Sequence, residues 1–329
     1  MLTSTSASSF SSATSVIKSV INRRDFLKYT GLGVASLGVL GAAAVPAAAA
    51  DGRAVHLTIL HTNDMHSRIE PFPDNAAQWA GMGGMARRAA LIAQVREQEP
   101  NVLLLDSGDI WQGTPYFNFF QGELEYKLMS QMAYDASTLG NHDFDNGLEG
   151  LQKQLPNATF PFLIANYDFT NTILAGKFQP YKVFEKQGVR IGVFGIGIEM
   201  AGLVADKNFG ATQYLDPVAT SRAMVAKLRG AERCDLVICL SHLGYKYENP
   251  KIDDHKLAAQ VDGIDLILGG HTHTFLDAPV PVASPNGHPT LINQVGWSGI
   301  NLGRLDYSFT PGKRRPTVAA TAVLPITTA

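Results

Sequence analysis

The sequence predicts an α/β protein in which helices cover a central sheet. From Val55 onward, short apolar runs alternate with segments of helical periodicity, which is the pattern of sheet-centred α/β domains. The chain has 329 residues, 45% hydrophobic and 17% charged, so it can bury one large core or two small ones. The first fifty residues differ in composition, and we exclude them from the fold.

Residues 1–50 have the features of a twin-arginine export signal. Arg23 and Arg24 precede a Gly- and Ala-rich apolar run, and Ala48-Ala49-Ala50 is the small-residue end typical of a cleavage site. An uncleaved membrane anchor is the alternative, because the apolar run is nearly long enough to span a bilayer. No cysteine follows the run, which excludes a lipid anchor on such a cysteine. We expect a periplasmic or secreted protein without a stable membrane anchor.

Eight apolar runs predict strands, because each is short and lies between turn-forming or polar residues. They cover residues 56–61, 102–106, 162–165, 189–195, 236–240, 266–268, 290–294 and 302–309. Helices are expected between them, near residues 85–99, 124–134 and 218–229. The last helix has a defined start, since Asp216 can cap it and Pro217 suits the first helical position.

Charge and cysteine content exclude two classes of protein. The leader carries a net charge of +3, which leaves −5 on the rest of a chain whose total is −2. No basic stripe remains for a nucleic-acid polymer, whereas small anionic substrates are compatible if bound cations supply positive charge. Cys234 and Cys239 would lie about 16 Å apart along a strand, beyond the roughly 7 Å that a disulfide allows. We therefore expect two buried free thiols and no disulfide scaffold.

Polar motifs follow the expected strands at their carboxyl ends. In α/β sheets, ligands bind outside the carboxyl ends of strands, so these motifs should converge on one edge. Four segments follow expected strands, namely His61-Thr62-Asn63-Asp64-Met65-His66, Asp106-Ser107-Gly108-Asp109, Ser241-His242, and Gly269-Gly270-His271-Thr272-His273, and the loop Gly140 to Gly147 is the fifth segment.

Outside the expected strands, the motifs contain five of the nine histidines, namely His66, His142, His242, His271 and His273. A single histidine is more often a surface or hydrogen-bonded imidazole than a ligand, but five such histidines beside Asp, Asn or Gly favour a metal site. A pair of cations about 3.5 to 4 Å apart needs a bridging carboxylate and terminal nitrogen or oxygen ligands.

Other residues of these motifs suit the remaining positions of a paired metal site. Asp109 suits the bridge, since a carboxylate has two oxygens and the neighbouring Gly108 lets the backbone approach closely. Asp64 and His66 are separated by one residue and can face one ion. Asn141 can offer an amide oxygen without adding charge.

In this order, the motifs resemble those of the calcineurin-like metallophosphoesterases, and in particular the catalytic half of the bacterial 5'-nucleotidases. Gly113-Thr114-Pro115 and Leu139 through Asp145 agree with the same branch. The resemblance covers nearly all of residues 55–309. It implies a four-layer αββα sandwich, with two mixed sheets packed face to face between helices, in a catalytic domain spanning residues 51–329.

The resemblance also implies two divalent metal ions and a catalytic histidine. One ion would be held by Asp64, His66, Asp109 and His273, and the other by Asp109, Asn141, His242 and His271. This mixture of nitrogen and oxygen donors suits Mn, Zn, Co or Fe better than Ca or Mg. His142 is implied as the catalytic residue, oriented by Asp145, while Asp143 would hold the loop through hydrogen bonds. Capping of a helix that begins near Asn146 is the alternative role of Asp145.

The implied reaction is hydrolysis of nucleotides or similar small phosphate esters by a metal-bridging hydroxide. A 2',3'-cyclic phosphodiesterase and a thiosulfate-ester hydrolase are alternatives within the same branch. An inactive metal-binding subunit is an alternative of another class, which the complete residue set disfavours. A Walker loop and a Gly-x-Ser-x-Gly elbow are both missing from the sequence, so motor chemistry and serine hydrolysis have no support.

The second domain of the 5'-nucleotidases, which binds the base and the substrate phosphate, is not expected in this chain. We expect that a separate polypeptide carrying such a domain provides it. A run of aromatic residues after Asp109 is a candidate contact for substrate or partner, although core packing is the commoner role of such residues. These residues are Trp111, Tyr116, Phe117, Phe119 and Phe120.

Overall fold

The computed structural model describes residues 54–310 and 315–327, so the predicted export signal lies outside the described residues. Within the described part, every helix is too short or too polar to cross a membrane.

The first sheet has five strands in the order β13-β12-β1-β2-β3. At its centre, β1 (Val55–Thr62) runs parallel to β2 (Val102–Asp106) and antiparallel to β12 (Asn301–Phe309). The edges are β3 (Ala136–Ser137), parallel to β2, and β13 (Thr317–Pro325), antiparallel to β12. The sheet is therefore mixed.

The second sheet has six strands in the order β10-β11-β9-β8-β6-β5. Four of them are parallel: β11 (Pro289–Asn293), β9 (Leu266–Leu268), β8 (Leu236–Ser241) and β6 (Val189–Ile196). Antiparallel edges are supplied by β10 (Val280–Ala283) and β5 (Tyr181–Lys186). A separate two-stranded ribbon consists of β4 (Tyr167–Asp168) and β7 (Gln213–Tyr214).

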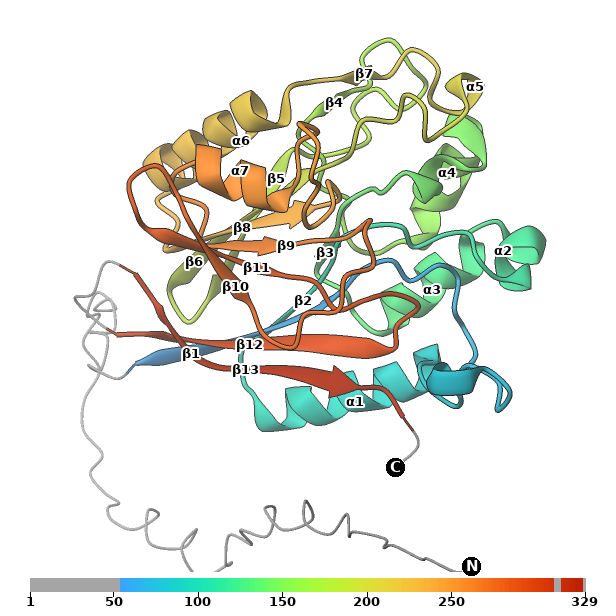
Figure 1. Ribbon diagram of the computed structural model, residues 1–329, viewed down its shortest axis with the longest axis horizontal. Coiled ribbons are helices and arrows are strands. Elements are labelled where there is room, and N and C mark those ends of the chain that lie inside the picture. The colour runs from blue at the N-terminus through green and yellow to red at the C-terminus, as the bar shows by residue number, and fades with distance from the viewer. Residues whose placement is uncertain (1–53, 311–314, 328–329) are drawn as a thin grey trace, which may run out of the picture. The chain divides into compact units, whose positions relative to one another are not determined.

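Helices cover the outer face of each sheet (Figure 1). The first sheet is covered by α1 (Met85–Gln98), α3 (Glu123–Gln131) and α4 (Gly147–Gln154), and the second by α6 (Pro217–Ala226) and α7 (Asp254–Gln260). Two short helices, α2 (Pro115–Phe120) and α5 (Asp206–Phe209), lie in connecting segments. The predicted four-layer αββα architecture is confirmed.

Strand β2 shows why its sequence is a continuous apolar run. Leu103 and Leu105 pack between the two sheets, while Val102 and Leu104 pack on the side of the helices. Both faces of such a strand are buried, so apolar residues point to both sides and the usual alternation of apolar and polar residues is missing. Strand β8 repeats the pattern, and its Cys239 packs beneath the helices as a free, buried thiol, as does Cys234. The prediction of two unpaired cysteines is confirmed.

Seven of the eight predicted strands are present, and the strand predicted at residues 162–165 is wrong. That segment forms only isolated bridges, because its successive amides donate to different neighbours. The amide of Leu163 donates to Ser137, that of Ile164 to Gln179 and that of Ala165 to Gly195. A strand requires a ladder with one neighbour, which an apolar run alone does not guarantee.

All three predicted helices form close to their expected bounds. Helix α6 begins as predicted, since Oδ1 of Asp216 accepts a hydrogen bond of 2.6 Å from the amide of Ala219, and Pro217 occupies the first turn. It ends at Ala226 and continues as a π-helical turn, Lys227–Ala231. Strands β5, β10 and β13 were not predicted; they are edge strands whose residues are partly or fully exposed.

The carboxyl ends of β1, β2, β8, β9 and β11 meet at one edge of the sandwich (Figure 1). A hydrogen bond of 2.7 Å from Oγ of Ser107, after β2, to the carbonyl oxygen of Leu268, at the end of β9, joins the two sheets there. The loops that follow these strands are consequently held within contact distance of one another.

Candidate metal centre

The turns at this edge are held in an unusual backbone conformation. Non-glycine residues rarely adopt a positive φ, and such strain persists where the surrounding structure imposes it, often at functional sites. Five of the seven predicted metal ligands have this conformation: Asp64 at 50°, His66 at 47°, Asp109 at 55°, His271 at 71° and His273 at 52°. The sharp turns direct the side chains of adjacent motif residues into one site.

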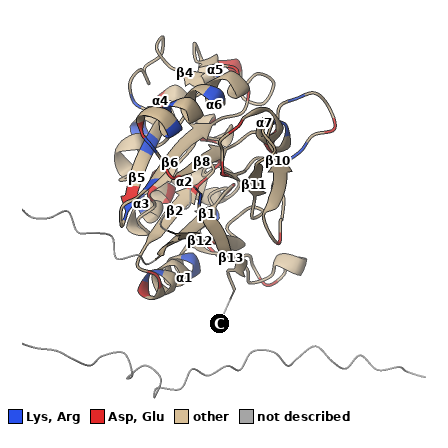
Figure 2. Cartoon of the chain, turned by 90° about the vertical axis from the view of Figure 1, so that its left-hand side faces the viewer, with Lys and Arg blue, Asp and Glu red and all other residues tan. Residues whose placement is uncertain are grey.

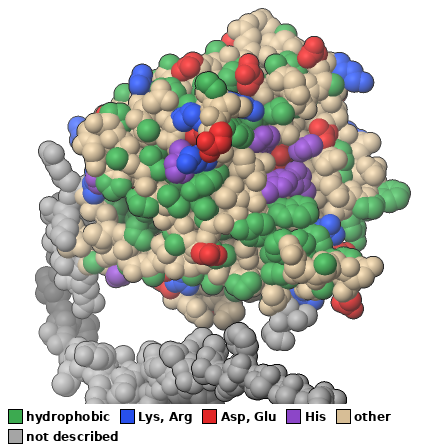
Figure 3. Space-filling view, in the orientation of Figure 1, with side chains coloured by type: hydrophobic (Ala, Val, Ile, Leu, Met, Phe, Trp, Pro, Cys, Tyr) green, Lys and Arg blue, Asp and Glu red, His purple; other side chains and the backbone are tan. Residues whose placement is uncertain are grey.

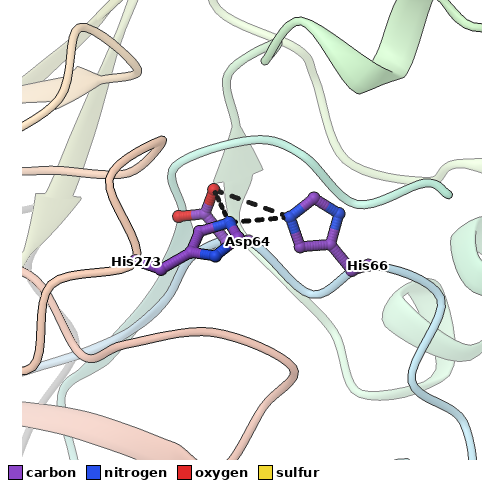
Figure 4. A group of neighbouring side chains, drawn as sticks. All are labelled: Asp64, His66 and His273. Carbon is purple, nitrogen blue, oxygen red and sulfur yellow. Dashed lines mark hydrogen bonds and ion pairs between the residues drawn. The ribbon is translucent and has the colours of Figure 1, made fainter. Parts of the chain in front are cut away.

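The first cluster consists of Asp64, His66 and His273 (Figure 4). Nε2 of His273 lies 3.4 Å from Oδ1 of Asp64 and 2.9 Å from Nε2 of His66. Nδ1 of His66 lies 3.3 Å from the carbonyl oxygen of Trp111, which can only accept a hydrogen bond, so the proton belongs on Nδ1. The lone pair of Nε2 then faces the other two side chains.

The second cluster consists of Asp109, His242 and His271. His242 is fully buried, and its Nδ1 lies 2.7 Å from the carbonyl oxygen of Ser107, which again directs the lone pair of Nε2 into the site. Nε2 of His242 is 3.1 Å from Oδ2 of Asp109. The amide oxygen of Asn141 lies 2.8 Å from Nδ1 of His271, so Asn141 belongs to this cluster as well.

Asp109 lies between the two clusters. Its Oδ2 is 3.1 Å from Nε2 of His242 in the second cluster and 4.0 Å from Nε2 of His66 in the first. Its Oδ1 accepts a hydrogen bond of 2.8 Å from the amide of His142. The two clusters are thus adjacent, and one carboxylate reaches toward both, which is the arrangement that the sequence predicted.

The charges of the site compensate one another. Burial opposes ionisation of Asp109, but the imidazoles of His242 and His66 outweigh it and lower the pKa of the carboxyl. Burial likewise disfavours a protonated His242, yet the Asp109 and Asp64 carboxylates raise its pKa. Burial, reinforced by His242, lowers the pKa of His271 to about 4, so that His271 is neutral at pH 7. Only neutral imidazoles and ionised carboxylates bind cations, so an ion at the second cluster would displace the proton that the two carboxylates favour on His242.

The donor atoms fit two divalent cations. In each cluster, three ligand atoms from three side chains lie within 4.8 Å of one another. Nε2 of His242 is buried without a hydrogen-bond partner and lies 3.1 Å from Oδ2 of Asp109. An uncompensated buried polar atom is costly, and a cation between these groups would satisfy it. Imidazole together with carboxylate donors suits Zn, Mn, Co or Fe.

His142 and Asp145 form a pair beside the first cluster. The ring centroids of His142 and His66 are 5.3 Å apart, and Nδ1 of His142 lies 2.9 Å from Oδ2 of Asp145. This hydrogen bond raises the pKa of His142. Asp145 does not cap a helix, because α4 starts after Asn146 without a side-chain cap. The alternative role considered for Asp145 is therefore wrong.

Asp143 holds the loop, as the sequence predicted. Its carboxylate is fully buried and accepts hydrogen bonds from the amides of Asp109, Ile110 and Gly140, at 3.1, 3.2 and 2.8 Å. Three backbone donors on one carboxylate tie the Asp109 turn to the Gly140 turn. The position of Asp109 relative to His142 depends on this connection.

The aromatic residues after Asp109 divide into two groups. Trp111 and Phe117 are buried in the core, so packing is their role. Tyr116 is half-buried and stacks on Phe120, while Phe119 is 80% exposed. Tyr116, Phe119 and Phe120 all lie in α2 and remain candidates for contact with a substrate or partner.

A sixth segment, residues 294–299, also contributes to the site and was missed by the sequence analysis. The amide of Ser298 donates a hydrogen bond of 2.7 Å to the carbonyl oxygen of Asp64, and Asn63 bonds to both Asp64 and Gly296. Trp297 stacks on the ring of His273. This segment follows β11 at the same sheet edge, so the strand-end rule applied to the predicted strand 290–294 was the available signal.

The surface around the site is mixed in character. Figure 3 shows histidine side chains gathered on the face toward the viewer, with acidic side chains among them and hydrophobic side chains beside them. In Figure 2, Lys and Arg are dispersed among Asp and Glu over the helices that face the viewer, and form no continuous stripe on that side.

Comparisons with known proteins agree with the geometry. Residues 57–275 match the model of the family described as calcineurin-like phosphoesterase. The 5'-nucleotidase of Rattus norvegicus is 37% identical over 77% of this chain and 46% of its own length, and that of Vibrio vulnificus is 36% identical over 79% and 50%. The solved 5'-nucleotidase precursor of Thermus thermophilus has a TM-score of 0.75 and 33% identity over 83% of this chain and 55% of its own.

The chain spans about half the length of the curated relatives it matches. The match nevertheless includes every motif that contributes to the two clusters, from Asp64 to His273. On these grounds, the chain belongs to the calcineurin-like phosphoesterase family, whose members are metal-dependent phosphoric ester hydrolases.

Proposed function

We propose that this protein is an exported phosphoesterase that uses two divalent ions to hydrolyse nucleotides or similar small phosphate esters. The observation that carries the proposal is the pair of ligand clusters around Asp109, with His142 and Asp145 beside them. The relatives named as 5'-nucleotidases support a nucleotide as the substrate.

The residues divide the work as follows. Asp64, His66 and His273 would hold one ion, Asn141, His242 and His271 the other, and Asp109 would contact both. Bound ions would supply Lewis acidity at phosphorus and an activated water for in-line attack. The carboxylate of Asp109 neutralises part of the added positive charge, and Asp143 keeps that carboxylate in place through the backbone.

His142 acts on the substrate through its free ring nitrogen. Because Asp145 engages Nδ1, the nitrogen left to face a substrate is Nε2. A proton on Nε2 can be donated as a hydrogen bond to a phosphoryl oxygen or to the leaving oxygen, where negative charge builds during hydrolysis. Asp145 fixes the plane of the ring and stabilises its protonated form.

A substrate panel tests the proposal. The purified protein, loaded with Mn²⁺ or Zn²⁺, is assayed with AMP, 2',3'-cyclic AMP, bis(p-nitrophenyl) phosphate and a thiosulfate ester. We expect the highest kcat/KM with AMP, and a loss of at least about 100-fold in Asp109→Asn. Asp74→Asn, at an exposed carboxylate that is not part of the motifs, is the matched control.

The outcomes of the panel separate the candidate reactions. A preference for the cyclic or diester substrate would replace the nucleotidase by a phosphodiesterase of the same family. A preference for the sulfur ester would move the reaction away from phosphorus. Equal activity in Asp109→Asn and the native protein would refute catalysis at the two clusters.

Export through the twin-arginine route is the second part of the proposal. It is supported by Arg23 and Arg24 ahead of the apolar run. Replacing both by lysine should retain the protein in the cytoplasm, whereas Lys28→Arg should leave export unchanged; cell fractionation measures both. Unaltered export of the double variant would contradict this route. The expectation of a separate specificity-domain polypeptide stays a prediction.

A further inference from the structure

His273 differs from His66 and His242 in how its ring is oriented. Nδ1 of His66 and Nδ1 of His242 each face a backbone carbonyl oxygen, at 3.3 and 2.7 Å. Such hydrogen bonds normally fix the plane of a ligating imidazole. Among the described residues, Nδ1 of His273 has no such partner, and its side chain is 38% exposed. Among the described residues, no backbone hydrogen bond at Nδ1 sets the orientation of this ring.

The indole of Trp297 lies parallel to the ring of His273. The ring centroids are 5.6 Å apart and the planes differ by 5°. Offset stacking of this kind restricts rotation about the Cβ–Cγ bond of His273, because any rotation of the imidazole separates the two ring faces. Trp297 thereby supplies the orientation that a carbonyl oxygen supplies at His66 and His242.

Trp297 is itself held rigidly. Its ring meets Phe72 edge-to-face with centroids 5.8 Å apart, and the guanidinium of Arg68 lies 4.1 Å above the Phe72 ring. The residues on either side of Trp297 are bonded to the first strand-end motif. Gly296 accepts a hydrogen bond of 2.6 Å from Nδ2 of Asn63, and the amide of Ser298 donates to Asp64.

These contacts all converge on one cluster. Asn63 also donates to Oδ2 of Asp64 at 2.6 Å, so the segment that carries Trp297 is tied to Asp64 and stacked on His273. The aromatic rings that meet Trp297 are those of Phe72 and His273, and neither residue belongs to the second cluster. The segment therefore sets the position of two ligands of the first cluster relative to each other.

We propose that Trp297 is a positioning residue that orients His273 and thereby tunes the affinity of the first ion site without altering the second. The inference rests on the proposed two-ion site. Loss of a residue that orients a metal ligand without contacting the metal typically weakens metal binding by about 10 to 100-fold. We expect that range for Trp297→Leu at one of two binding steps, and a return to near-native affinity in Trp297→Phe, which keeps an aromatic face.

Titration calorimetry with Mn²⁺ or Co²⁺ on the metal-free full chain measures both binding steps without any substrate. Trp79→Leu is the matched control, since Trp79 also stacks on an aromatic ring of the same loop, that of Phe275, which is not a ligand. Trp79→Leu should leave the affinities of both ion sites within about threefold of the native values. The visible absorption of bound Co²⁺ provides a spectroscopic check, because it responds to the orientation of the ligands.

A double-mutant comparison assigns the effect to one site. In a His273→Ala background, Trp297→Leu should cause no further loss of ion affinity, since the ring that it orients is gone. In a His271→Ala background, which disables the second site, it should cause the full loss at the remaining step. Circular dichroism and thermal unfolding establish that each variant is folded.

Several results would overturn the proposal. They are an equal loss of affinity for both ions in Trp297→Leu, an unchanged affinity of the first site, no recovery of affinity in Trp297→Phe, or a loss in the His273→Ala background as large as in the native chain. Failure of the proposed function is distinguishable from these. A protein that binds two ions with the expected Trp297 dependence but hydrolyses no ester would refute the phosphoesterase and leave the positioning role intact.

Discussion

Gly140 places a tight steric limit on the position of Asp109, and Gly140→Ala tests that limit. A Cβ atom at Gly140 would lie 2.1 Å from Oδ1 and 2.6 Å from the backbone nitrogen of Asp109. Ordinary contact begins at 3.4 Å, so the carboxylate oxygen would have to move by about 1.3 Å. That oxygen accepts the hydrogen bond from the amide of His142, which the movement would stretch or break.

The expected magnitudes follow from this displacement. Forcing a methyl group into a packed site costs about 1 to 3 kcal/mol of unfolding free energy. A misplacement of about 1 Å among catalytic groups costs on the order of 100-fold in rate. Gly140→Ala should therefore unfold at lower denaturant concentration, bind less than two ions per chain and lose about 100-fold in kcat with AMP.

Three measurements check this prediction: urea unfolding of the metal-free chain, metal content by mass spectrometry and steady-state kinetics. Gly230→Ala is the control, because a Cβ atom there meets nothing within 4 Å and the residue lies in a helical turn. It should be neutral or slightly stabilising. A Gly140→Ala protein with two ions, native stability and activity within about threefold would show that this contact does not constrain Asp109.

Three further predictions concern the ions, the His142 pair and a buried histidine. Removal of metal by a chelator should abolish hydrolysis and lower the melting temperature, since ions that bind only the folded state stabilise it by about 4 kcal/mol at 1,000 times their Kd; assays and calorimetry after adding Mn²⁺ back should show recovery. Asp145→Asn should lower kcat about 100-fold at unchanged metal content, because it removes the charge that orients and supports His142; kinetics and metal analysis measure the two effects. Burial lowers the pKa of His61 to about 3, so as pH falls the unfolded chain binds a proton on this residue before the folded chain does. The stability that neutral His61 contributes is therefore complete above about pH 6.5 and is lost as pH falls toward 3. Urea unfolding of the metal-free chain should show a loss of up to about 1.4 kcal/mol of unfolding free energy per pH unit, and a smaller loss in His61→Gln.

Each of these predictions has a control and a contradicting outcome. Ca²⁺, which prefers oxygen ligands, should not restore activity after chelation, and its equal effectiveness would contradict the nitrogen-rich site. Asp168→Asn, at a carboxylate outside the motifs, should leave kcat unchanged; a native kcat in Asp145→Asn would remove Asp145 from the mechanism. His56→Gln, at an exposed position, should keep the pH dependence, and an identical slope in His61→Gln would exclude His61 as its source.

Much of the fold could be predicted because its central strands are buried on both faces. The apolar runs of β2, β8 and β9 reflect that burial directly. The start of α6 was also readable, since an N-cap and its proline act on the nearest amides. Residues 162–165 have the same apolar character as a strand but bond to several neighbours in turn, and a local sequence carries no record of how its bonds are distributed.

The candidate site shows a similar division. The residue types and their places after strands indicated Asp64, His66, Asp109, Asn141, His142, Asp145, His242, His271 and His273 as one group. The strand-end rule covers the segments that carry Asn63 and Trp297, but the contacts of these two residues could not be predicted, because neither is a metal donor of the motifs. Their contacts join positions more than two hundred residues apart in sequence, such as Asn63 with Gly296 and Trp297 with Phe72.

By itself, the sequence determined which chemistry is available: imidazoles, carboxylates and an amide at the ends of buried strands, whose burial follows from local hydrophobicity. Only the tertiary structure decided the geometry of that chemistry. The left-handed turns at Asp64, Asp109 and His273 are unfavourable locally and persist because both packed sheets and distant hydrogen bonds impose them. The separation of the donors into two clusters around Asp109, and the stacking of Trp297 on one of them, depend on contacts between distant segments, which exist only once the chain has folded.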